Sequence, residues 1–149
     1  MQQLVEKIRR LRFSWNNKQL TEADFYRLCR RFRIDVQELP LQTNGFYYCL
    51  KGRHFIVIDS RLTGHKKLFV MFHELAHFLM HAPDSGVTAN FHGIGKRTRK
   101  EIEADAFALC AMLPKSWIEK LLPHEICEHE GISQEMLAER LSIYKNFGI

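Results

Sequence analysis

The sequence has no apolar run long enough to cross a membrane, and it has no secretory signal at its N-terminus. A membrane-spanning helix needs about 20 consecutive, mostly apolar residues, and no such run occurs in this chain. Residues 1–10 contain basic side chains, but no apolar core leads from them to a cleavage site. We therefore expect neither a membrane-spanning nor a secreted protein, but a cytoplasmic one.

Closely spaced cysteines are also missing. Cys29, Cys49, Cys110 and Cys127 lie far apart and form no CxxC pair, so a cysteine-based zinc ribbon is not expected. A chain of this size can build its own core and does not need disulfides. We therefore expect four reduced thiols, which agrees with a cytoplasmic location.

The composition fits one domain of ordinary size. A chain of 149 residues that is 46% hydrophobic can bury a substantial core. We expect residues 1–149 to form a single domain, with a helical N-terminal extension over 1–20 and a helical C-terminal tail over 115–149. The net charge of +5 is compatible with an acidic partner or with nucleic acid. By itself the charge selects neither.

The strongest motif is HELAH at residues 73–77, an HExxH pattern within the apolar stretch 68–81. On a helix, residues four apart lie on one face, so His73 and His77 can hold one metal ion together. Glu74 lies beside that face, where its carboxylate can take a proton from a metal-bound water. The alternative is a pair of buried histidines that hydrogen-bond to the backbone. We favour the metal, because a helix that is apolar nearly all round buries these groups and they then need compensation.

A small sheet is expected before this helix. Residues 21–24 are typical of a capped helix start, and a strand should follow at 34–39, before a proline. Two runs rich in aromatic and β-branched residues, 46–50 and 54–58, flank a turn that contains a glycine. This pattern predicts a β-hairpin.

Residues 82–97 are rich in glycine, proline and polar side chains, which predicts a long loop at the rim of the metal site. His92 lies in this loop and is either a catalytic assistant or, as we favour, an exposed loop histidine. The basic run at 96–100 is either a clamp for an acidic peptide or phosphate, or a solvated turn. We favour the solvated turn.

The segment EIEADAFA at residues 101–108 can supply a third metal ligand, which a catalytic zinc site needs. If Glu101 faces the metal, Asp105 follows it by four positions and can hydrogen-bond a ligand histidine from behind. Glu103 then points away from the metal. In a competing interpretation, Thr98 and Glu101 form a capping box and the carboxylate turns back to the helix start. We prefer the ligand, because HExxH otherwise lacks a third donor.

The C-terminal part predicts short helices, a turn at Gly131, an N-cap at Ser133 and a last helix over 134–144. A helix, a glycine-containing turn and a second helix are similar to a helix-turn-helix. Glutamates on and before the last helix would repel phosphates, among them Glu135 and Glu139. We therefore expect this tail to pack against the core, and direct DNA binding is not expected.

Together, the hairpin, HELAHFLMH, the loop and EIEADAFALCAMLP resemble the ImmA/IrrE family of metallopeptidases. The resemblance covers roughly residues 20–144. It implies an α+β, zincin-like metallopeptidase domain with a small β-sheet packed beside the HExxH helix and a helix-turn-helix-like C-terminal tail. It also implies that His73, His77 and Glu101 bind zinc and that Glu74 activates water.

Known members of that family cleave a helix-turn-helix transcriptional repressor, which switches on stress-response or mobile-element genes. We therefore expect a zinc-dependent endopeptidase with a protein substrate, although another divalent ion is possible as the physiological metal. The candidates for contacting substrate or an oxyanion are Tyr47, Tyr48 and His92. The alternatives are a regulatory protein that uses zinc only to stabilise its fold, and a DNA-binding regulator that works through the C-terminal helices.

Overall fold

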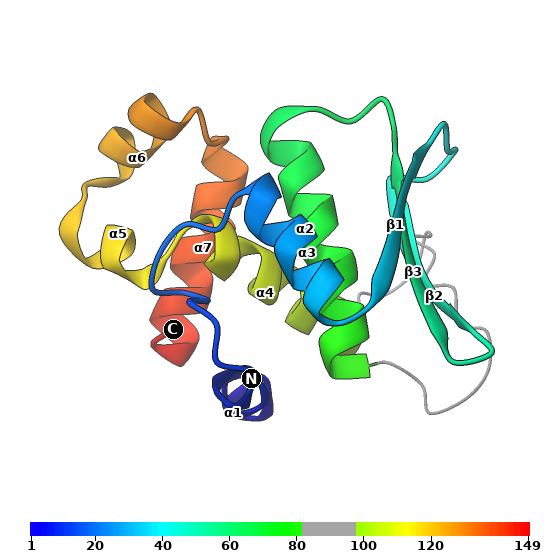
Figure 1. The fold of residues 1–149 in the computed structure, drawn as a ribbon. Coiled ribbons are helices and arrows are strands. Elements are labelled where there is room, and N and C mark those ends of the chain that lie inside the picture. The colour runs from blue at the N-terminus through cyan, green and yellow to red at the C-terminus, as the bar shows by residue number, and fades with distance from the viewer. Residues whose placement is uncertain (82–97) are drawn as a thin grey trace. The chain divides into compact units, whose positions relative to one another are not determined.

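The computed structural model describes residues 1–81 and 98–149, and it is a mixed α+β structure (Figure 1). Its described part forms two compact units, one over 21–108 and one over 1–20 together with 109–149. The prediction of an α+β fold with a small sheet is confirmed. No helix among the described residues is long and apolar enough to span a bilayer.

A three-stranded sheet forms one side of the 21–108 unit. Its strands are β1 (Ile34–Leu39), β2 (Gly45–Leu50) and β3 (Arg53–Asp59), in the order β1-β3-β2. The predicted hairpin is β2 with β3, which pair antiparallel, and β1 pairs parallel to β3. Lys51 and Gly52 make the hairpin turn with φ values of 50° and 75°, a region that glycine adopts without strain. Ile56, Val57 and Ile58 of β3 are all buried, so both faces of this strand are covered there, which explains its continuous apolar run.

Two helices cover the sheet in this unit. The long helix α3 (Gly64–His81) packs against β2 and β3, and α2 (Glu22–Arg31) packs against β1 and α3. The capping box predicted for α2 is present, because Thr21 and Asp24 exchange hydrogen bonds between side chain and backbone. Phe25 of α2 meets Phe72 of α3 edge to face, with ring centroids 6.0 Å apart.

The central helix begins at Gly64, four residues before the apolar stretch from which we predicted it. The extra turn is polar and carries Lys67, whose ammonium contacts Glu22 at 2.9 Å and Glu38 at 2.8 Å. Glu22 belongs to α2 and Glu38 to β1. The additional turn therefore ties the start of α3 to two neighbouring elements, and hydrophobic periodicity alone does not reveal such contacts.

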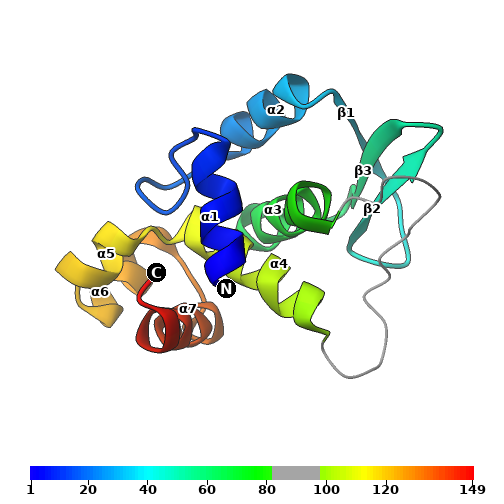
Figure 2. The same cartoon turned by 90° about the horizontal axis from the view of Figure 1, so that it is seen from below.

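The second unit is helical and contains both described chain ends (Figure 2). It contains α1 (Gln2–Arg10), α5 (Lys115–Lys120), α6 (Pro123–Glu130), α7 (Gln134–Phe147) and the last residues of α4 (Arg99–Met112). Within the N-terminal extension that we expected over 1–20, α1 ends at Arg10, and Arg12 has a positive φ of 51°. The last helix runs three residues further, to a cap at Gly148 with φ 68°.

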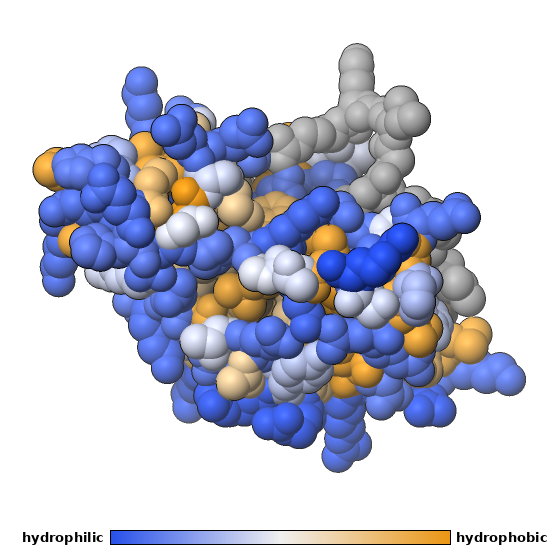
Figure 3. Space-filling model, turned by 90° about the horizontal axis from the view of Figure 1, so that it is seen from above, coloured by the Kyte–Doolittle hydropathy of each residue, from blue (hydrophilic) through white to orange (hydrophobic). Residues whose placement is uncertain are grey.

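The surface seen from above mixes hydrophobic and hydrophilic residues (Figure 3). Large hydrophobic side chains that stay exposed are few among the described residues, and two of them are neighbours just before α6: Leu121 and Leu122. Scattered exposed leucines are ordinary in proteins. An adjacent exposed pair is less common.

Arg140 of α7 is a charged residue in the interior of this unit. Its side chain is completely buried. It donates hydrogen bonds to the carbonyl oxygens of Leu113 and Ile149, both at 2.7 Å, and to the side-chain oxygen of Asn16 at 3.0 Å. One guanidinium thus joins the beginning, the middle and the end of this unit, and it is not available to contact a phosphate.

Replacing Arg140 by alanine should lower the free energy of unfolding by roughly 3 kcal/mol, because buried oxygen acceptors then lose their donor. Arg140→Lys should fall between wild type and Arg140→Ala, since an ammonium cannot reproduce the planar fork. Lys145→Ala, an exposed change on the same helix, should stay within about 0.5 kcal/mol of wild type. Urea unfolding followed by circular dichroism measures all three, and equal midpoints for the two alanine variants would contradict the role given to Arg140.

Candidate metal centre

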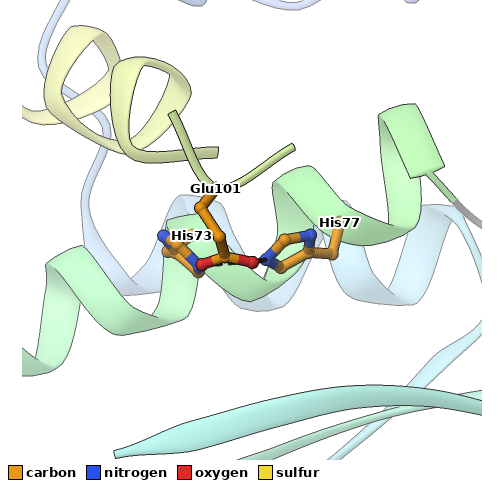
Figure 4. A group of neighbouring side chains, drawn as sticks. All are labelled: His73, His77 and Glu101. Carbon is orange, nitrogen blue, oxygen red and sulfur yellow. Dashed lines mark hydrogen bonds and ion pairs between the residues drawn. The ribbon is translucent and has the colours of Figure 1, made fainter. Parts of the chain in front are cut away.

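His73 and His77 lie on one face of α3, as their spacing predicts, and both are buried (Figure 4). Their Nε2 atoms are 3.0 Å apart. Neighbouring apolar residues on α3 are fully buried, among them Phe72 and Leu75. The two imidazole rings are therefore fixed in a dry environment with their nitrogens turned toward one point.

Glu101 reaches the same point from the first turn of α4 (Figure 4). Its two carboxylate oxygens lie 3.3 Å from Nε2 of His73 and 3.2 Å from Nε2 of His77. Thr98 meanwhile accepts a hydrogen bond from the backbone N–H of Glu101 at 3.3 Å. The two interpretations of this segment are thus partly compatible, because Thr98 caps the helix while the carboxylate of Glu101 faces the histidines.

These three residues fit a divalent metal ion. A tetrahedral zinc ion with bonds of about 2.0–2.1 Å places its ligand atoms about 3.3 Å from one another. The separations of 3.0, 3.2 and 3.3 Å among the two imidazole nitrogens and the carboxylate oxygens are close to that value. Two histidines and one carboxylate leave a fourth position open, as catalytic sites require. The cluster can therefore hold a metal, and its donors suit several divalent ions.

Asp105 lies one helical turn after Glu101 and contacts the other nitrogen of His73. Its carboxylate oxygen is 2.7 Å from Nδ1 of His73. When Nδ1 of His73 carries the proton and donates it to this carboxylate, the lone pair of Nε2 points to the metal position. Asp105 therefore favours the tautomer in which Nε2 can bind a metal. Because Glu101 and Asp105 are four residues apart, they lie on the same face of α4, and both can reach His73.

The acidic surroundings also change the protonation of His73. Burial lowers the pKa of this imidazole, but hydrogen bonds to Asp105 and Glu101 outweigh that effect and raise the pKa to about 9. At neutral pH the metal-free site therefore holds a protonated His73 between carboxylates. A metal ion that binds here has to displace that proton, so metal affinity rises with pH up to about 9.

Glu74 follows His73 on α3 and is completely buried. Its negative charge contributes to the raised pKa of His73, so the two groups lie close enough to interact. It is not a member of the His73, His77 and Glu101 cluster. A buried carboxylate beside the ligands, but not among them, is the arrangement that a general base requires.

Glu103 turns to another partner. Its carboxylate pairs with Arg99 at 2.9 Å along α4. This agrees with the helical geometry that separates Glu103 from Glu101 by about 200°. Arg99 belongs to the basic run predicted at 96–100, of which 96 and 97 lie outside the described residues.

The three other candidates have different positions. Tyr47 is buried on the side of the sheet that meets Phe78 of α3, and its hydroxyl lies 2.8 Å from Nδ1 of His54. Burial raises the pKa of Tyr47 to about 12, so the hydroxyl stays protonated at neutral pH. Tyr48 points to the opposite face of the sheet, where it stacks on Phe55. His92 lies outside the described residues. A role for any of the three in catalysis stays a prediction.

His54 is a residue that the sequence did not single out. Besides its contact with Tyr47, its ring lies edge-on to Phe78, which follows His77 on α3. The only available signal was a histidine at the start of an apolar strand. That signal is too weak to identify a residue that links the sheet to the helix that carries His73 and His77.

Comparison with known proteins finds a matching family and a similar phage protein. The model of a peptidase family, described as the IrrE N-terminal-like domain, matches residues 29–142, which is more than half of the chain. A protein of Bacillus phage phi105, named "Uncharacterized immunity region protein 2", is 32% identical over 68% of this chain. The matched part spans 65% of the phage protein, slightly less than two thirds of its length.

Proposed function

This chain belongs to the IrrE N-terminal-like family of peptidases, and on that premise we propose that it is a metal-dependent endopeptidase. The membership confirms the family that the HELAH and EIEADAFALCAMLP segments resemble. The observation that carries the proposal is the convergence of His73, His77 and Glu101 from two helices on one point. A buried carboxylate, Glu74, lies next to that cluster.

The chain's own residues supply the acid–base chemistry. A divalent metal held by the cluster would polarise the scissile carbonyl and favour deprotonation of water. Glu74 takes the proton of the attacking water and later donates it to the leaving amine. Asp105 keeps the imidazole of His73 in one tautomer and one orientation during this cycle.

The sheet offers a way to align an extended substrate. Among the described strands, β2 is at an edge, since it pairs only with β3 in the order β1-β3-β2. A peptide added antiparallel to such an edge forms backbone hydrogen bonds that do not depend on its sequence. We propose that β2 (Gly45–Leu50) presents the substrate backbone to the metal centre, which lies on the helix packed against this sheet.

For the substrate, we propose a helix-turn-helix transcriptional repressor, whose cleavage derepresses stress-response or mobile-element genes. Support comes from the family and from the name of the similar phage protein, which refers to an immunity region. Zinc is the proposed metal because two histidines and a carboxylate are a frequent catalytic zinc set.

Co-expression with a repressor encoded beside this gene tests the proposal. Intact-mass analysis should find two repressor fragments whose masses add up to the full chain plus one water. A chelator added to the purified pair should stop fragment formation. A repressor that stays intact while it binds the wild-type protein would instead favour a regulatory protein that does not cut.

A further inference from the structure

The two helices α6 and α7 line an open groove of about 450 Å³, and none of its lining residues belongs to the metal centre. Residues from one face of each helix line it: Pro123, His124, Cys127 and Glu128 from α6, and Gln134, Leu137, Ala138 and Leu141 from α7. The spacings are those of neighbouring turns on a helix. We call this feature the α6–α7 groove.

The turn that joins the helices fixes the shape of the groove. Gly131 ends α6 in a left-handed conformation with φ 63°, and its N–H bonds to the carbonyl of Cys127. Ile132 is buried and Ser133 caps α7 through the N–H of Met136. Because both helix ends are capped and anchored, the groove is a preformed feature of this unit.

Charge is distributed unevenly around the groove. The whole chain has a net charge of +5, yet residues 121–139 contain five glutamates and no lysine or arginine: Glu125, Glu128, Glu130, Glu135 and Glu139. Two of the five already have hydrogen-bond partners within this unit. Glu125 caps α6 by accepting from the N–H of Leu122, and Glu130 accepts from the amide of Gln19. Glu128 lines the groove and is exposed, and Glu135 is exposed beside the groove residue Gln134.

We propose that the α6–α7 groove binds an amphipathic helix of a partner protein, whose apolar stripe enters the groove and whose lysines and arginines meet Glu128 and Glu135. Docking of an apolar helix face between two helices is a common mode of recognition. The exposed pair Leu121 and Leu122 directly precedes Pro123, the first groove residue of α6. The same carboxylates repel nucleic acid, so a nucleic-acid ligand does not fit this surface.

A second copy of this chain is a poorer occupant. Among the described helices, two are basic and amphipathic: α1, with Lys7, Arg9 and Arg10 in its last turn, and α2, with Arg30 and Arg31 in its last turn. The apolar sides of both helices are already used, because Leu4 and Ile8 of α1 and Phe25 and Leu28 of α2 are buried. The groove therefore needs an apolar stripe from another protein.

A library of displayed 18-residue helical peptides, with both faces randomised, provides a probe without knowledge of the partner. Panning on the purified full-length protein should enrich peptides with an apolar stripe at i, i+3, i+4 and i+7 and with lysine or arginine beside it. Binding of an enriched peptide is then measured by fluorescence anisotropy. This binding does not depend on peptidase activity, so the Glu74→Gln protein should bind the peptide as well as wild type does.

Matched variants locate the binding. Ala138→Phe fills the groove from an exposed position and should weaken binding at least about 10-fold. Glu128→Lys and Glu135→Lys should each weaken it about 5-fold at low salt, and less at high salt. Glu6→Lys makes the same charge change on the exposed side of α1 and should have no effect. Circular dichroism verifies that each variant is folded.

Three results would overturn the proposal. The first is a panning experiment that enriches no helical peptide, or enriches peptides without basic residues. The second is an enriched peptide whose binding is unchanged by Ala138→Phe. The third is a concentration-dependent dimer in sedimentation experiments that Ala138→Phe abolishes, since that would assign the groove to self-association.

Discussion

Replacing Glu74 by glutamine is expected to lower the rate of substrate cleavage by about 10²–10⁴-fold, the usual effect of losing a general base. Glutamine has the size and shape of glutamate, so the buried position next to His73 should tolerate it. Its amide cannot take the proton of the attacking water. The loss should therefore appear in the turnover number, while substrate binding changes little.

Metal content and stability separate this effect from a damaged site. Glu74 lies outside the His73, His77 and Glu101 cluster, so Glu74→Gln should bind as much metal as wild type. Glu103→Gln is the matched control, because it makes the same chemical change at a glutamate that pairs with Arg99. If Glu74→Gln loses its metal, Glu74 is a ligand. If it cleaves at the wild-type rate, another group is the base.

The sequence could predict the centre of this fold because its chemistry is local. A spacing of four on an apolar helix places His73 and His77 together without any knowledge of the remaining chain. The same spacing relates Glu101 to Asp105, and the structure has one carboxylate in front of His73 and the other behind it. What spacing could not decide was the direction of Glu101. That direction depends on how α4 approaches α3, which is a tertiary property.

Arg140 shows where sequence reasoning ends. Its neighbours on the helix include Glu135 and Glu139, a pattern typical of a solvated face. Its actual partners lie 27 positions away at Leu113 and 124 positions away at Asn16. Nothing in the local pattern predicts such contacts, because a buried arginine is tolerated only where distant carbonyls happen to converge on it.

The limits of the helices were missed for a related reason. The first turn of α3 is polar, so hydrophobic periodicity places the start of that helix at residue 68. The contacts of Lys67 with Glu22 and Glu38 extend the helix back to Gly64. Residues that stabilise the end of a helix by contacting other elements do not follow its hydrophobic periodicity, so the sequence does not show where the helix ends.

Substitutions around the metal centre should reduce metal affinity in a fixed order. Glu101→Ala removes a proposed ligand and should weaken binding by more than about 100-fold, whereas Asp105→Asn, which changes only the partner of His73, should cost about 10–100-fold. Glu103→Ala should leave the affinity unchanged, because that side chain pairs with Arg99. Elemental analysis after dialysis, together with chelator competition, measures all three.

This order depends on the rotation of α4 about its axis. Glu101 and Asp105 are about 40° apart on the helix, and Glu103 lies on the far side. A rotation that brought Glu103 to the histidines would reverse the outcome, so that Glu103→Ala would lose the metal and Glu101→Ala would keep it. The three variants therefore test the orientation of α4 that places Glu101 at Nε2 of His73 and Asp105 at its Nδ1. They also test the proposal that Glu101 is the third ligand.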